Sequence, residues 1–123
     1  MSKQSFAILR KIGHVDTLIS PEKQKWIVEV HPEVSFWELN GKQPLKNKKS
    51  SDAGVAERLK LLEPHYPSLK RYLLESASAG TKRDDILDAA VAAWSAERVA
   101  RGQACSLGGE EVDGRGLRME IAY

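Results

Sequence analysis

Apolar side chains recur along the chain with two different periods, and these periods predict helices and strands. In residues 5–19 they fall every three or four positions, which is the spacing of one face of a helix. Residues 26–31 are rich in β-branched side chains and stop at Pro32, so they predict a short strand with Glu29 and His31 on one face. The last residues, 117–123, alternate apolar and polar side chains and predict a second strand.

The middle of the chain predicts helices separated by short breaks. A short helix is expected over residues 33–39, because Asn40-Gly41 follows as a stop signal. Residues 42–51 predict a basic, polar loop. Ser51 or Asp52 can cap the next helix, which carries an apolar stripe of Val55, Leu59 and Leu62.

The strongest helical pattern comes later, at residues 81–101. This segment is rich in alanine, opens with the capping-box pattern Thr81-x-x-Asp84 and is followed by Gly102. Before it, residues 68–76 predict a helix and residues 76–80 a flexible linking loop. Residues 106–116 contain four glycines and predict another loop.

Composition indicates one soluble domain spanning residues 1–123. The chain is 41% hydrophobic and 29% charged, and no stretch is apolar for long enough to cross a bilayer. The amino terminus lacks the continuous apolar core of a secretion signal. Cys105 is the only cysteine, so no intrachain disulfide can form and a reducing cytoplasm is expected. With 19 basic and 17 acidic residues, nucleic-acid binding must depend on a local patch.

Two acids on the helix expected at residues 81–101 are candidates for metal chemistry. At about 100° per residue, Asp84 and Asp88 lie together at the edge of the apolar face, whereas Asp85 points toward solvent. Two helical carboxylates and one from a strand, Glu29, can hold Mg²⁺ or Mn²⁺ against a phosphate. Asp84 can equally stabilise the helix through its dipole, because it lies in the first turn. Glu29 can instead pair with a nearby Lys or Arg. Capping does not explain Asp88, which is one turn further in.

A cluster of four lysines in the expected loop at residues 42–51 is a candidate for nucleic-acid binding. Among them, Lys48 and Lys49 are the residues that we expect to contact phosphates. The alternative is a solvated loop with no ligand. Trp26, Trp37 and Trp94 lie on apolar repeats and are expected in a core or interface rather than stacked on bases.

Three segments, in this order, give the chain a family resemblance. Residues 29–36 (EVHPEVSF), 84–89 (DDILDA) and 116–123 (GLRMEIAY) resemble the domain-of-unknown-function family 429. Residues 4–16 and 48–62 are similar to other segments of that family, so the resemblance extends over nearly the whole chain. Members are described as RNase H-like nucleases, which implies an α/β fold and metal-dependent phosphodiester hydrolysis.

The resemblance covers the carboxy-terminal half of such a domain. It implies a partial RNase H-like fold, mostly helical, with about two strands and four to five helices. It further implies that Glu29, Asp84 and Asp88 act as catalytic residues and ligands of Mg²⁺ or Mn²⁺. The first-strand aspartate that bridges the two metal ions in these enzymes has no counterpart here, because Asp16 belongs to a helical segment and not to a first strand.

Two hypotheses therefore stand side by side. The first is a metal-dependent nuclease that is incomplete as an isolated chain. The second is a catalytically inactive module with a structural or nucleic-acid-binding role. In either case two strands form a marginal sheet with open edges, so we expect a homodimer or a complementing chain to cover them.

Overall fold

The chain has a mixed α/β fold. The structure is a computed structural model that describes residues 3–123, and the side chains of residues 6–76 and 80–123. This part of the chain forms five α-helices and a two-stranded antiparallel sheet, as the sequence predicted in kind. It divides into two compact units. One comprises the chain up to Val28 together with Gly108–Glu120, and the other comprises Glu29–Leu107 and Ile121–Tyr123.

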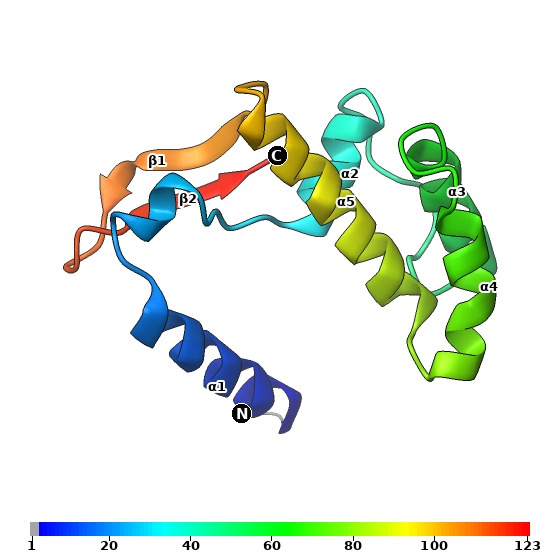
Figure 1. The fold of residues 1–123 in the computed structure, drawn as a ribbon, viewed down its shortest axis with the longest axis horizontal. Coiled ribbons are helices and arrows are strands. Elements are labelled where there is room, and N and C mark those ends of the chain that lie inside the picture. The colour runs from blue at the N-terminus through cyan, green and yellow to red at the C-terminus, as the bar shows by residue number, and fades with distance from the viewer. Residues whose placement is uncertain (1–2) are drawn as a thin grey trace. The chain divides into compact units, whose positions relative to one another are not determined.

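The larger unit is a group of four helices. They are α2 (Pro32–Leu39), α3 (Asp52–Leu62), α4 (Leu69–Ala79) and α5 (Arg83–Ala100). The long helix α5 contacts the other three, as Figure 1 shows. Its predicted apolar face is confirmed, because Leu87, Val91 and Trp94 are all buried against the neighbouring helices. Burial of this face, together with apolar side chains of the other three helices, forms the core of the larger unit.

Polar contacts fix α2 against α5. The Ser95 hydroxyl donates to the Ser35 hydroxyl at 2.8 Å, and both side chains are fully buried. Arg98 pairs with Glu38 at 3.2 Å and lies over the Trp94 ring, 4.7 Å from its centroid. A pair of buried hydroxyls has few alternative partners, so these contacts set the register of the two helices.

The smaller unit contains α1 (Lys3–Leu18), the 3₁₀ helix η1 (Lys23–Lys25) and most of the β-hairpin. The helix predicted over residues 5–19 is thus confirmed. Arg115 in the hairpin turn pairs with Asp16 at 2.6 Å, and the backbone N–H of Arg118 donates to the Gln24 side chain at 2.8 Å. The apolar side chains of α1 are half or more exposed, for example Val15 at 59% and Leu18 at 66%.

The strands differ from the sequence prediction. The hairpin pairs β1 (Ser106–Val112) with β2 (Arg118–Ala122), so the predicted final strand is confirmed and the loop predicted at residues 106–116 is wrong for β1. The glycines that suggested a loop permit the ladder instead. A Cβ at Gly108, whose φ is +80°, would lie only 2.3 Å from the Met119 carbonyl oxygen.

The strand predicted at residues 26–31 is also wrong. Within the described chain, this segment contributes an isolated parallel bridge between Val30 and Ala122, and the Glu29 carbonyl accepts from the Ala122 N–H at 2.8 Å. Trp26 lies in this segment and is 71% exposed, so it is not a core residue of the chain, whereas Trp94 is.

Helix ends follow local chemistry more closely. Ser51 caps α3 as predicted, with its hydroxyl accepting from the Gly54 N–H at 3.0 Å. Residues 76–80 were expected to be a loop, but α4 continues to Ala79 and stops at Gly80, which has a left-handed φ of +68°. The capping box expected at Thr81 is wrong too, because Lys82 occupies the cap position of α5.

In the described part of the chain, no helix is both long enough and apolar enough to span a bilayer.

Candidate functional site

Two carboxylates on the first two turns of α5 form the centre of the candidate site. Asp84 and Asp88 are four residues apart, which places them one turn from each other on the same side of the helix. Asp88 is 22% exposed, and its Oδ2 accepts from the Lys49 ammonium at 2.8 Å. Its other oxygen, Oδ1, is buried and has no hydrogen-bond partner in the described chain. The Asp88 carboxylate is therefore only half satisfied by the protein.

Lys49 is the cation of this site. Its hydrogen bond to Asp88 raises the pKa of the ammonium, partial burial lowers it, and the charges of Asp88, Asp84 and Glu33 raise it. The net shift is upward, so Lys49 stays protonated and positively charged at any physiological pH. The side chain is 44% exposed, so water reaches the ion pair. Three carboxylates thus act on one partly solvated cation.

A second ion pair lies next to the first and joins α2 to α3. Arg58 on α3 is 3% exposed in its side chain, and its Nη2 donates to both carboxylate oxygens of Glu33 at 2.9 Å. Its guanidinium lies over the Phe36 ring, 5.3 Å from the centroid. The Glu33 side chain is 45% exposed, so loss of Glu33 would leave a buried arginine charge unpaired, whereas loss of Arg58 would leave Glu33 in contact with water.

The position of Arg58 on the apolar stripe of α3 is a sequence signal for a buried charge. Val55, Leu59 and Leu62 define the buried stripe of α3, and position 58 falls on the same stripe at a spacing of three and four residues. A charged residue on a buried face needs a partner of opposite charge. Which acid provides that partner depends on tertiary packing, and the answer, Glu33, lies 25 residues away.

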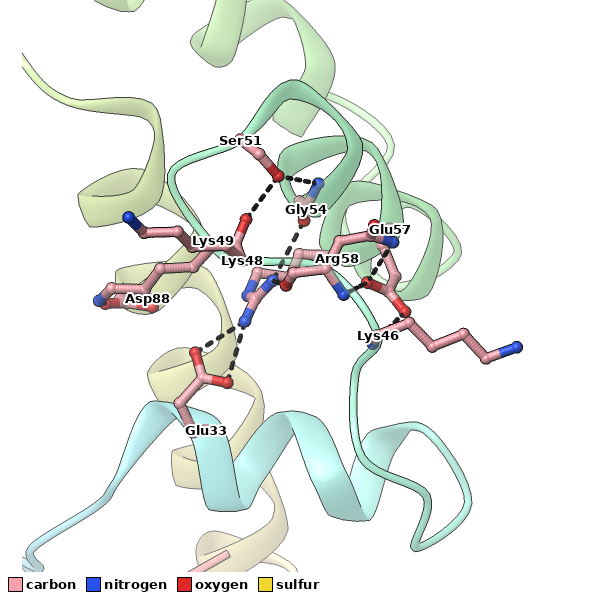
Figure 2. Close-up of polar contacts among 10 residues, drawn as sticks. Glu33, Lys46, Lys48, Lys49, Ser51, Gly54, Glu57, Arg58 and Asp88 are labelled. Carbon is pink, nitrogen blue, oxygen red and sulfur yellow. Dashed lines mark hydrogen bonds and ion pairs between the residues drawn. The ribbon is translucent and has the colours of Figure 1, made fainter.

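The basic loop between α2 and α3 is held by the same network, as Figure 2 shows. The Glu57 carboxylate accepts from the backbone N–H groups of Lys46 at 2.9 Å and Asn47 at 3.0 Å. The Arg58 Nη1 donates to the Asn47 carbonyl, and the Ser51 hydroxyl donates to the Lys48 carbonyl. The loop was predicted correctly as basic and polar, but its backbone is fixed by side chains of α3.

Gly54 makes this arrangement possible. It lies in the first turn of α3, where the Lys48 carbonyl oxygen approaches the backbone closely. A Cβ built at Gly54 would lie 2.0 Å from that oxygen, and the contact is with backbone atoms that cannot rotate away. The loop can therefore dock on α3 only where the helix lacks a side chain.

The predicted site residues fall into two groups. The structure places Asp84 and Asp88 together with Lys49, and it adds Glu33, which the sequence had not singled out. Glu29 is exposed, and Glu33 rather than Glu29 is the acid from this segment that acts on Lys49. Lys48 is exposed on the loop, whereas Lys49 is engaged with Asp88.

Asp84 and Asp88 are the two carboxylates that could bind a metal ion here, although Asp88 is paired with Lys49. Among the described residues, no three His, Cys, Asp or Glu side chains are gathered to share an ion. The donor chemistry of Asp84 and Asp88 suits Mg²⁺ or Mn²⁺, which often use one or two carboxylates and complete their shell with water and phosphate. The unsatisfied Oδ1 of Asp88 supplies an acceptor for such an ion.

Comparison with known proteins identifies a family. No curated protein and no solved structure matches the chain. The model of the family described as "Protein of unknown function (DUF429)" matches residues 1–112, which is nearly the whole chain. Both halves of the site, the loop with Arg58 and the acids of α5, lie within the matched range. The chain belongs to the DUF429 family.

Proposed function

We propose that this protein takes part in metal-dependent hydrolysis of nucleic-acid phosphodiesters, with Asp84 and Asp88 as metal ligands. The observation that carries the proposal is the state of the Asp88 carboxylate. Its Oδ2 pairs with the Lys49 ammonium, and its buried Oδ1 has no partner among the described residues. The RNase H-like fold, and a place in the cytoplasm, are parts of the same proposal and derive from the family resemblance and the cysteine content.

The residues of the chain would divide the work as follows. Asp84 and Asp88 hold the ion, which when bound lowers the pKa of a water and neutralises phosphate charge. Lys49, which pairs with Asp88 in the chain without metal, would have to release that carboxylate for an ion to bind, and its ammonium could then contact a phosphate oxygen. Arg58 and Glu33 keep α2 and α3 in place beside α5. Glu29, whose side chain is exposed, would be a further ligand, as the family resemblance implies.

Two carboxylates leave several ligand positions to other groups. We propose that a second copy of the chain, or a complementing chain, contributes to the complete site. The exposed apolar side chains of α1 support the existence of a partner, because exposed apolar surface is often covered in an assembly. Sedimentation velocity is expected to show a dimer, and a monomer at all concentrations would count against a second copy.

The experiment that tests the proposed activity compares wild type with Asp88→Asn. Purified protein is incubated with branched DNA, single-stranded DNA and RNA, each with Mg²⁺, Mn²⁺ or EDTA. We expect metal-dependent cleavage by wild type that falls at least about 100-fold in Asp88→Asn, since an amide cannot supply the anionic ligand. Asp85→Asn, at an exposed neighbouring position, is the matched control and should retain activity.

A catalytically inactive oligomeric module with a structural or nucleic-acid-binding role is the second candidate. The Lys49–Asp88 pair favours it, because the two charges already neutralise each other without a metal. The same assay separates the two candidates. Binding without cleavage, equal in wild type and Asp88→Asn, would reject hydrolysis and retain the module.

A further inference from the structure

We infer that residues 46–51 form a preorganised loop that binds the phosphate backbone of a nucleic acid through Lys46 and Lys48, with Glu57 and Gly54 as its positioning residues. This inference rests on the proposed function for its ligand class. It changes the residues expected from sequence for the metal-free chain, since Lys49 is there paired with Asp88 and Lys46 takes its place.

The lysines of the loop have different surroundings. Of the described lysines in this loop, Lys49 is the one with an ion pair, which it forms with Asp88 at 2.8 Å. Lys46 and Lys48 are exposed, and the contacts found for them use their backbone atoms, the Lys46 N–H and the Lys48 carbonyl. Their ammonium groups can therefore meet phosphates without breaking an internal ion pair.

The backbone beneath these two lysines is held at several points. Glu57 accepts two consecutive backbone N–H groups, from Lys46 and Asn47, and also the Asn47 side-chain amide at 3.1 Å. Those hydrogen bonds lower the pKa of Glu57, so the carboxylate remains charged at neutral pH. The Lys48 carbonyl is fixed by Ser51 against Gly54.

Fixing the backbone matters because flexible residues lose entropy when they bind. A loop that is already ordered in the folded protein does not lose this backbone entropy when it binds. A loop whose lysines are merely solvated has no need of a buried arginine, a carboxylate clamp and a glycine contact beneath it. These anchors point to a loop that holds its charges in position for a ligand.

The Glu57 clamp gives a test in which simple electrostatics and positioning predict opposite results. Glu57→Gln removes a negative charge beside the lysines, so charge alone predicts tighter binding of nucleic acid. A glutamine side chain accepts hydrogen bonds at one oxygen instead of two, so it cannot hold both the Lys46 and the Asn47 N–H groups. The loop is then freer, and we expect weaker binding. We expect the dissociation constant for Glu57→Gln to rise by about threefold or more, because the freed loop then loses backbone entropy when it binds.

The direct contacts are tested with the double variant Lys46→Ala/Lys48→Ala. Binding of a fluorescein-labelled 20-nucleotide single-stranded DNA is measured by fluorescence anisotropy in EDTA, from 50 to 200 mM salt. For single strands, each lost phosphate contact lowers the slope of log affinity against log salt by about 0.7. The slope of log affinity against log salt should fall by about 1.4 for the double variant. Lys60→Ala/Lys70→Ala removes the same charge from exposed positions on α3 and α4 and should leave the slope unchanged.

Three results would overturn the inference: an unchanged slope in the loop variant, an equal loss in the Lys60/Lys70 variant, or tighter binding by Glu57→Gln. Binding to vesicles containing phosphatidylglycerol, with no binding to DNA or RNA, would also overturn it in favour of a membrane surface. Because the measurement excludes metal, its outcome is independent of cleavage. Absence of hydrolysis alongside the predicted binding changes would reject the proposed activity and keep this inference.

Discussion

At the scale of single residues, the site depends on which charges are paired inside the protein. Lys49 and Asp88 were both candidates for external ligands, and the structure joins them to each other. Asp88 lies one turn inside its helix, where capping does not explain an acid. Its partner could not be predicted from sequence, because the two residues are 39 positions apart and meet only through packing of the loop on α5.

Glu57 provides a residue-scale prediction about pH. Hydrogen bonds from the Lys46 and Asn47 N–H groups lower its pKa from an ordinary value of 4.5, so the folded protein favours the charged form. Stability from this clamp is present above pH 4.5 and is lost as the pH falls through the lower folded value. The amide ¹H shifts of Lys46 and Asn47 should therefore titrate below pH 4.5.

The Glu57→Gln variant is the control for this titration, since its side-chain amide does not titrate. The Lys46 and Asn47 shifts should then stay constant over the same acid range. A midpoint above 4.5 in wild type, or an identical titration in the variant, would show that Glu57 does not clamp the loop.

At the scale of elements, helices could be predicted from sequence better than strands. The apolar arc of α5 and the Ser51 cap of α3 follow from local spacing and chemistry, and both are confirmed. Residues 26–31 had the composition of a strand, but pairing is set by distant backbone, and here it is limited to Val30. Glycine-rich β1 was missed because its glycines allow close backbone approach instead of a loop.

Two glycines inside helices should respond to alanine in opposite ways. In α1, a Cβ at Gly13 would meet no described atom within 4 Å, so Gly13→Ala should raise the free energy of unfolding by roughly 0.5–1 kcal/mol. At Gly54, the same change drives a Cβ to 2.0 Å from the Lys48 carbonyl oxygen. We expect Gly54→Ala to destabilise the protein despite the better helix propensity of alanine.

Urea denaturation followed by circular dichroism measures both changes. The loop amides of Gly54→Ala should also shift in ¹H–¹⁵N spectra, whereas those of Gly13→Ala should not. Equal stabilisation by the two substitutions would mean that the Lys48 backbone is not held against α3.

At the scale of the whole molecule, two compact units share one β-hairpin, whose strands pass from one unit into the other. The larger unit contains the acids, the loop and the helical core that positions them. The smaller unit exposes an apolar helix. Family membership and the mixed α/β class followed from sequence, because motifs and periodicity are local. The pairing of charges across α2, α3 and α5 did not, because it depends on tertiary packing.

The central claim is that Asp84 and Asp88 bind a divalent ion in exchange for Lys49. Titration of ¹⁵N-labelled protein with Mn²⁺ tests it most directly, because the paramagnetic ion broadens nearby amide signals. We predict selective broadening at residues 84–88 and at Lys49, loss of that broadening in Asp88→Asn, and affinity roughly threefold to tenfold higher in Lys49→Met, where no internal cation competes. Broadening confined to other acids, or unchanged affinity in Lys49→Met, would contradict the account.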